Sequence, residues 1–206
     1  MSSTETGARD PDEAERRRFE QHRIERALAG ERDAQEELLR VHYARVHATA
    51  FRLLGNHEDA EDLAQECFVR AFRALAFYRG EGSFAGWLRR ILVHLVQDRF
   101  RARAQRPEAG LLPPELAGGR EPHGVLEARE LGRVLADALA TLATPLRIAL
   151  VLRTREGLEY EEIAAATGVT PATARTRVMK ARKLLQRLLA PYLGARDERR
   201  EPRRAP

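Results

Sequence analysis

The chain has 206 residues, 43% hydrophobic and 33% charged, with a formal net charge of +5 at pH 7. This length allows one large domain or two small ones, and the single cysteine, Cys67, excludes an intrachain disulfide and a zinc-finger cluster. The polar N-terminus lacks the apolar segment of a signal peptide, and no apolar run approaches the roughly 20 residues that span a bilayer. These features predict a soluble, cytoplasmic protein without membrane insertion, and the positive charge favours a polyanionic partner.

Good helix formers dominate the composition, and valine and isoleucine never alternate cleanly with polar residues, so we expect an all-α fold. Residues 1–18 are polar and aperiodic, which is typical of a disordered tail. A short helix is predicted over Gln21–Leu28. A capping box of Asp33 and Glu36 predicts the start of a longer helix that runs towards Leu54. Its apolar stripe is formed by Leu38, Val41, Val46, Ala50 and Leu53.

A third helix is predicted to start near Asp59, after the break at Gly55-Asn56. Helical spacing gives it a buried stripe of Ala60, Leu63, Ala64, Cys67 and Ala71. A second face of this helix carries Asp59, Asp62 and Glu66, with Gln65 at its border. Such a concentration of carboxylates in a basic chain indicates a surface with a partner other than nucleic acid, although a solvated acidic face is the simpler alternative.

A fourth helix is predicted over Phe84–Arg103, with arginines along its outer side and aromatic residues near its start. The aromatic residues are Phe77, Tyr78, Phe84 and Trp87, and the arginines are Arg89, Arg90, Arg99, Arg101 and Arg103. Aromatic rings beside cations suit single-stranded DNA, because a base can stack while the backbone is neutralised. Aromatic clusters at helix junctions are more often part of a core, and we expect Phe84 and Trp87 to be largely buried.

Prolines and glycines between residues 104 and 126 exclude a long regular element and predict an interdomain linker. A second helical block begins near Glu127. Its core pattern consists of Leu135, Leu139, Leu142, Leu146, Leu150 and Leu152.

The stretch GLEYEEIAAATGVTPATARTRVMKARKLL predicts a helix-turn-helix. A short helix over Tyr160–Thr167 ends at Gly168, which can adopt the left-handed cap. Thr170 is a good N-cap, and Pro171 suits the first position of a basic helix that we expect to end near Leu189. Residues from Gly194 onwards predict a loose tail. The packing side of the motif is predicted to consist of Ile163, Ala164, Val169, Ala174 and Val178.

In such a motif the second helix enters the major groove of DNA. Arg175 can bind guanine through two hydrogen bonds, and Thr176 and Met179 can contact a thymine methyl group. Arg177, Lys183 and Arg187 are better placed for phosphates. The competing interpretation is an amphipathic hairpin with a solvated basic face.

Four histidines, His42, His47, His57 and His94, lie near carboxylates in the sequence. Helical di-metal proteins use Glu-x-x-His pairs, and Glu58, Glu61 and Glu66 all lack a histidine three residues later. Nucleophile elbows and phosphate-binding glycine loops are also absent from the sequence. We therefore expect no metal, no cofactor and no catalytic residues, and a metal-dependent helical-bundle enzyme is a remote alternative.

Two segments together resemble bacterial RNA polymerase sigma factors of the extracytoplasmic-function group of the sigma-70 family. DAEDLAQECFVRAFRAL followed by FYRGEGSFAGWLRRIL resembles their region 2, and GLEYEEIAAATGVTPATARTRVMKAR resembles their region 4. The resemblance covers about 24–103 and 131–189. It implies a disordered tail (1–18), region 2 (19–103), a linker (104–126), region 4 (127–190) and a charged tail (191–206).

The resemblance also implies partners, which are core RNA polymerase, promoter DNA and, in many members, an anti-sigma factor. Polymerase binding is expected from Asp59, Asp62, Gln65 and Glu66. Recognition of the minus-ten element is expected from Phe77, Tyr78, Arg79, Trp87, Arg90, His94, Arg99 and Arg101. Recognition of the minus-thirty-five element is expected from Thr173, Arg175, Thr176, Arg177, Met179, Lys180 and Lys183.

Three positions depart from the family pattern. His94 replaces an asparagine that contacts a promoter base, Glu159 replaces a capping serine, and Gln35 replaces an aromatic residue. The sequence therefore predicts a non-enzymatic sigma factor but gives neither its promoters nor its inducing signal. The alternative is a helix-turn-helix regulator that binds DNA without polymerase.

Overall fold

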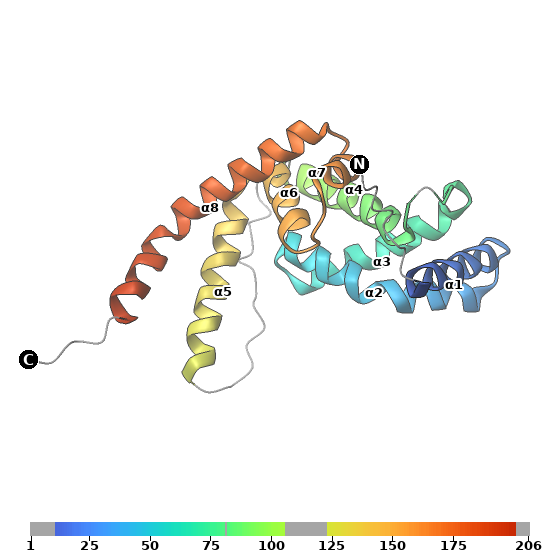
Figure 1. Cartoon of the computed structure of the whole chain (residues 1–206), viewed down its shortest axis with the longest axis horizontal. Helices are drawn as coiled ribbons and strands as arrows, with labels where there is room; N and C mark the ends of the chain where they lie inside the picture. The colour runs from blue at the N-terminus through green and yellow to red at the C-terminus, as the bar shows by residue number, and fades with distance from the viewer. Residues whose placement is uncertain (1–10, 81, 106–122, 201–206) are drawn as a thin grey trace, which may run out of the picture.

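The computed structural model describes residues 11–80, 82–105 and 123–200, and these residues form helices joined by short turns (Figure 1). The helices are α1 (Pro11–Leu28), α2 (Arg32–Leu54), α3 (His57–Arg73), the 3-10 turn η1 (Leu75–Phe77), α4 (Phe84–Ala104), α5 (His123–Thr141), α6 (Thr144–Thr154), α7 (Tyr160–Thr167) and α8 (Pro171–Arg200). The all-α prediction is confirmed for these residues. Most of the expected linker lies outside them, and the domain boundaries stay predictions.

Helices α1–α4 form an N-terminal unit whose core lies between α2, α3 and α4. The predicted stripe of α3 is confirmed, since all five of its residues are at most 1% exposed. The predicted stripe of α2 is wrong at Val41, which is 56% exposed, while His42 is 8% exposed with its ring 5.3 Å from that of Phe84. Helical spacing of four residues from Leu38 and from Val46 places position 42 on the buried side.

The ends of α1 and α2 differ from the expectation. Helix α1 begins at Pro11, before the expected Gln21, so residues 11–18 of the predicted tail are helical. The capping box was also predicted wrongly, because Glu31 is the N-cap of α2 and Asp33 lies within its first turn.

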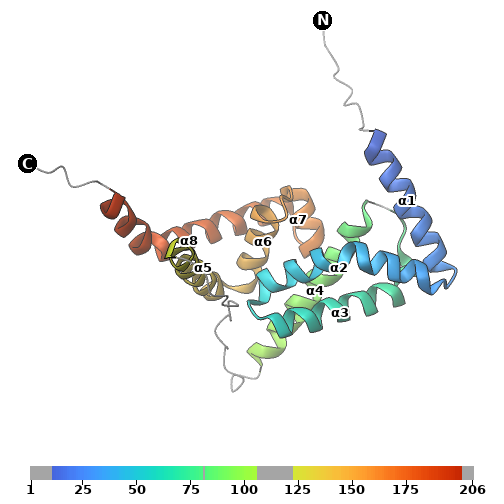
Figure 2. The same cartoon turned by 90° about the horizontal axis from the view of Figure 1, so that it is seen from below.

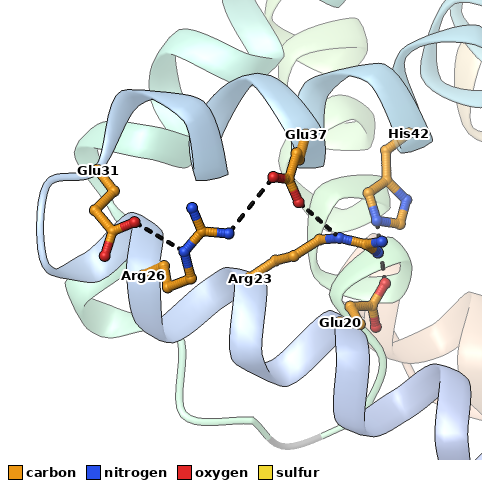
Figure 3. Close-up of polar contacts among 6 residues, drawn as sticks. All are labelled: Glu20, Arg23, Arg26, Glu31, Glu37 and His42. Atoms are coloured by element: carbon orange, nitrogen blue, oxygen red, sulfur yellow. Dashed lines mark hydrogen bonds and ion pairs between the residues drawn. The ribbon is translucent and has the colours of Figure 1, made fainter.

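Ion pairs fix α1 against α2 (Figure 3). Arg26 Nε lies 2.8 Å from Glu31, and Arg23 Nε lies 3.1 Å from Glu37, which Arg26 also approaches. His42 Nε2 lies 3.1 Å from a carboxylate oxygen of Glu20. Water screens the partly exposed arginine pairs, so these pairs orient α1 more than they stabilise it.

Helices α5–α8 form a C-terminal unit. Its core includes Ile148, Leu152, Ile163 and Val178, each at most 1% exposed. Gly168, with φ of +68°, ends α7 as predicted, because this left-handed conformation suits a residue without Cβ. Helix α8 begins at the expected Pro171. It continues to Arg200, so the predicted end near Leu189 is wrong, and residues 194–200 of the predicted loose tail are helical.

The two units lie in contact. Helix α7 packs against α4, and α6 packs against both α2 and α4. Figure 2 shows α6 and α7 between α8 and the N-terminal bundle. No sequence pattern indicated this contact.

Candidate nucleic-acid interface

The helix-turn-helix is built as its sequence indicates. The hydroxyl of Thr170 accepts a hydrogen bond from the Thr173 N–H at 3.3 Å and so caps α8. Ala174, Val178 and Ala181 recur every three or four residues and are fully buried against α6 and α7. Of the predicted packing side, Ile163, Ala164, Ala174 and Val178 are buried, and Val169 is half-buried against the core.

The opposite face of α8 brings the predicted recognition residues together. Thr173, Arg175, Thr176, Met179, Lys180 and Lys183 are exposed, and Arg177 is half-buried. From Pro171 to Gly194 the sequence contains no acidic residue, so these cations have no acidic neighbour along that part of their helix. The result is an exposed basic surface on the first three turns of a helix, which is the geometry that a major groove admits.

The start of α7 is capped although Glu159 stands where the family pattern has a capping serine. The carboxylate of Glu162 accepts a hydrogen bond from the Glu159 N–H at 2.9 Å, which satisfies a backbone group at the helix start. Glu159 itself pairs with Arg153 at 2.6 Å, and Arg153 lies over the ring of Tyr160. Arg175 lies over the same ring, 5.6 Å from its centroid, so the recognition helix contacts α7 through a side chain that also faces solvent.

Helix α4 carries the second basic surface. Ser83 caps it by accepting a hydrogen bond from the Gly86 N–H at 3.1 Å. Trp87, Arg90, His94 and Arg101 follow at spacings of three, four and seven residues and form one stripe. His94 and Arg101 are exposed, Trp87 and Arg90 are half-buried, and the His94 Nδ1 lies 2.7 Å from the Arg90 carbonyl oxygen.

Arg99 lies outside this stripe. It forms an ion pair with Asp59 on α3, and Arg103 pairs with the same carboxylate. Arg101 remains 70% exposed although it pairs with Asp98. Of the residues of α4 predicted to bind the minus-ten element, the structure therefore places all but Arg99 on one stripe.

The aromatic residues before and within α4 separate into core and surface. Phe84 is fully buried, as predicted, and Trp87 is half-buried with its ring 5.5 Å from that of Phe84. The Tyr78 ring meets Phe84 edge-on, and its hydroxyl donates to the Gly82 carbonyl at 3.1 Å. Burial, and secondarily the charge of Glu20, raises the pKa of Tyr78, so it is a neutral donor at physiological pH. Phe77, 80% exposed, is available to a base, and Arg79 beside it is also exposed.

The acidic face of α3 is divided by the fold. Asp62 and Gln65 are exposed, and the Glu66 side chain is 44% exposed and paired with Arg70 at 2.6 Å. The Asp59 side chain is only 13% exposed between its two arginines. Burial alone would raise the pKa of Asp59, but the hydrogen bonds and charges of Arg103 and Arg99 outweigh burial and lower it. The pairing joins residues about forty positions apart, so no local sequence signal could have found it.

The described parts of the chain were compared with two further kinds of site, a metal site and a membrane span. Residues 11–80, 82–105 and 123–200 contain no group of three histidine, cysteine or acidic side chains placed to hold a metal ion. Over the same ranges no helix is both long and apolar enough to cross a bilayer.

Comparison with known protein families gives one match in the N-terminal unit and one in the C-terminal unit. The family model described as sigma-70 region 2 matches residues 38–106, and that described as sigma-70, region 4 matches residues 132–185. The chain belongs to the extracytoplasmic-function group of the sigma-70 family, whose members are transcription initiation factors. The resemblance deduced from the two motifs is thereby confirmed.

Similarity to individual relatives supports the same family. The chain is 42% identical over 162 residues to the ECF RNA polymerase sigma factor SigE of Mycolicibacterium smegmatis, covering 76% of this chain but only 62% of that relative. It is 31% identical over 180 residues to the ECF RNA polymerase sigma-E factor of Escherichia coli, covering 82% of this chain and 94% of that protein.

Two solved structures share the fold. One is the sigma factor RpoE in complex with the anti-sigma factor NepR from Bartonella quintana, with a TM-score of 0.62 and 27% identity over 75% of this chain and 96% of that one. The other is CnrH in complex with the cytosolic domain of CnrY, also with a TM-score of 0.62, at 26% identity over 83% of this chain and 97% of that one.

Proposed function

We propose that this protein is a cytoplasmic, non-enzymatic sigma factor that binds core RNA polymerase, recognises a bipartite promoter and helps to open the DNA. The observation that carries the proposal is the segregation of charge. The first turns of α8 present cations and no acid, whereas Asp62 and Glu66 lie on an exposed face of another helix. Carboxylates on a DNA-facing surface would repel phosphates, so an acidic face suits a basic protein partner.

Three surfaces are assigned to three partners under this proposal. Asp62, Gln65 and Glu66 on α3 contact core polymerase, with Asp59 at the inner edge of that face. Phe77, at the end of η1, contacts the minus-ten element together with the α4 stripe of Trp87, Arg90, His94 and Arg101. The first three turns of α8 read the minus-thirty-five element as duplex DNA, with Arg175 as the base-contacting residue.

The exposed ring of Phe77 explains how opening is supported. Each base-pair step that is lost costs about 1.4 kcal/mol of stacking. One base stacked on an aromatic ring returns about 1–3 kcal/mol, so Phe77 can offset one or two lost steps. The rest must come from phosphate contacts and from the polymerase.

The proposal is tested by co-purification with core polymerase, followed by transcription from the promoters that the complex binds. We expect a stoichiometric complex and initiation that depends on this protein. A purified, folded chain that neither binds core polymerase nor supports initiation on any promoter recovered would contradict the proposal.

A second candidate function is a regulator that binds duplex DNA alone, because the helix-turn-helix is complete without another chain. Specific duplex binding of the free protein, unchanged by added core polymerase, would favour this alternative. A further proposed partner is an anti-sigma protein, since the Bartonella relative was solved in complex with one.

A further inference from the structure

Two arginine side chains meet at the ring of Tyr160, the first residue of α7. The Arg153 guanidinium, in the last turn of α6, lies 5.0 Å from the ring centroid. The guanidinium of Arg175, in the second turn of α8, lies 5.6 Å from the same centroid. Both distances fall within the roughly 6 Å over which the electron-rich face of an aromatic ring attracts a cation. Tyr160 is half-buried and packs against the core, so the ring offers both arginines a fixed support.

The two arginines differ in their other partners. Arg153 Nη1 pairs with the Glu159 carboxylate at 2.6 Å and donates a hydrogen bond to the Leu158 carbonyl at 2.7 Å. The hydrogen bond with Glu159 is the main reason that the pKa of Arg153 is raised, so this guanidinium is charged and paired. Among the residues that the structure describes, Arg175 forms neither an ion pair nor a side-chain hydrogen bond, and its side chain is exposed.

The ring holds the Arg175 guanidinium through its charge. An aromatic face accepts no conventional hydrogen bond, so the N–H donors of the guanidinium remain available to a base or a phosphate. A lysine or glutamate partner on α7 could not do this, because the first would repel the cation and the second would occupy its donors. Tyr160 therefore restrains Arg175 without competing with a ligand.

Glu159 makes this restraint depend on charge. Arg153 and Arg175 approach one ring, and two like charges that share a support repel each other. The carboxylate on Arg153 reduces that repulsion and so favours the approach of Arg175. Glu159 stands where the family pattern has an uncharged serine, and this substitution supplies the negative charge.

Restraint of Arg175 matters for reading a base, a step that rests on the proposed function. Two hydrogen bonds to one guanine require a single orientation of the guanidinium. A long side chain that is already held loses less rotamer freedom on binding than a free one. A phosphate contact positions the protein without reading sequence, so it depends less on that orientation. The ring contact should therefore affect base discrimination more than overall affinity.

We propose that Tyr160 is a positioning residue for Arg175: its ring holds the guanidinium ready to bind a guanine of the minus-thirty-five element, and Glu159 supports this by neutralising Arg153. Tyr160 acts through Arg175 and does not need to touch DNA. Base specificity of the recognition helix is then set partly by the start of α7, the neighbouring helix of the motif.

The first measurement is made on the free, full-length chain by nuclear magnetic resonance. The Arg175 Nε–Hε signal is assigned by its absence from Arg175→Lys. Protons above an aromatic ring are shifted upfield, so we expect a shifted signal in the parent chain and in Tyr160→Phe. In Tyr160→Leu the signal should move to the position of an exposed arginine, and in Glu159→Ser it should move part of the way. An Arg175 signal that is the same in the parent chain and in Tyr160→Leu would overturn the ring contact.

The second measurement is base discrimination by the complex with core polymerase. The base pair read by Arg175 is the one whose replacement no longer matters in Arg175→Ala. Discrimination is the ratio of affinities for promoters with and without that base pair. We expect Tyr160→Leu to lower this ratio roughly two- to fivefold, which is the worth of an exposed cation–π contact. Tyr160→Phe keeps the ring and should keep the ratio, and Glu159→Ser should lower it by less.

Tyr192→Leu is the matched control, because it removes a 53% exposed tyrosine of α8 far along the helix from Arg175. Its discrimination ratio should equal that of the parent chain. The salt dependence of binding should not change in Tyr160→Leu, because no phosphate-binding charge is removed. Thermal unfolding checks that each variant is folded.

A ratio that is unchanged or increased in Tyr160→Leu would overturn the positioning role, as would a ratio that falls equally in Tyr160→Phe. Failure of the proposed function looks different. A chain that never binds core polymerase, or a complex without base preference at Arg175, would contradict that function, while the Arg175 signal of the free chain would still decide the ring contact.

Discussion

The two units of this protein place their basic residues in opposite ways. On α4, Arg99 and Arg103 are tied to Asp59 of α3, and Arg101 pairs with Asp98 one turn earlier. On α8, the first acidic residue after Pro171 is Asp197, so the cations of the first turns have no acid near them on their helix. A count of arginines therefore overstates the charge that α4 offers to DNA, whereas it describes α8 well.

The difference reflects how each surface is assembled. The C-terminal surface lies on a single helix whose other face is buried, so its residues share a side by periodicity alone. The N-terminal surfaces are shared between α3, the segment after it and α4, and ion pairs between α3 and α4 hold these two helices in register. The acids of α3 consequently differ in their surroundings, since Asp59 pairs with two arginines of α4, Glu66 pairs with Arg70 on its own helix and Asp62 is exposed.

The largest effect is expected from changing the two acids of α3 that do not pair with α4. Asp62→Lys combined with Glu66→Lys should abolish binding to core polymerase in a pull-down, because opposed positive charges would meet across that interface. Glu36→Lys combined with Glu161→Lys changes the net charge equally at exposed positions elsewhere and should bind normally. Equal affinity of both double variants would contradict the acidic docking face.

The second prediction concerns the unpaired cations of α8. Arg175→Ala should cost about 1–3 kcal/mol at the minus-thirty-five element and relax base preference there. Lys183→Ala should weaken all sequences about equally and reduce the salt dependence by about one counterion. Binding of the holoenzyme to promoter variants over a range of salt concentrations separates the two. Identical behaviour of both variants would remove the distinction between base and phosphate contacts.

The third prediction concerns the paired cations of α4. Asp59→Asn should destabilise the folded chain at pH 7 by about 1–3 kcal/mol, because two arginines lose their anion in a half-buried site. The pKa of Asp59 is lowered in the fold, where the effects of Arg103 and Arg99 outweigh burial. The pairing therefore stabilises the fold above the ordinary carboxyl value of 3.8 and is lost as the pH falls through the folded pKa.

The free energy of unfolding, measured with urea at pH 7 and at successively lower pH, checks this prediction. The gap between the parent chain and Asp59→Asn should narrow below about pH 4. Asp98→Asn, at a position that is 51% exposed, should change stability by less than about 1 kcal/mol. A gap that widens on acidification would show that the sign of the pKa shift is wrong.

The smallest effect is expected at the N-terminal caps of α4 and α8, where a side-chain hydroxyl caps the helix in both units. Ser83→Ala and Thr170→Ala should each cost about 1 kcal/mol in thermal unfolding, since each removes a hydroxyl that accepts a backbone N–H. Ser83→Asp and Thr170→Asp retain an acceptor and should keep most of the stability. Full stability of both alanine variants would mean that the caps contribute nothing.

The sequence alone determined the features that depend on neighbours within a few turns of chain. The helix-turn-helix is such a case: Thr170, Pro171 and Gly168 fix the ends of two helices locally, and periodicity then assigns the buried and exposed sides of α8. The buried stripe of α3 followed in the same way. The error at Val41 came from the residue type, because valine was taken as buried although the spacing of four residues from Leu38 and from Val46 favours His42.

Only the tertiary structure decided which charges remain available. Asp59 meets Arg99 and Arg103 from about forty residues away, and Glu156 meets Arg45, Thr49 and Arg52 from more than a hundred. Side chains this distant have no fixed spatial relation until the core has formed, since a flexible segment of that length can place its ends in many ways. Composition and periodicity set the charge on each helix, but the packing of helices sets its partner.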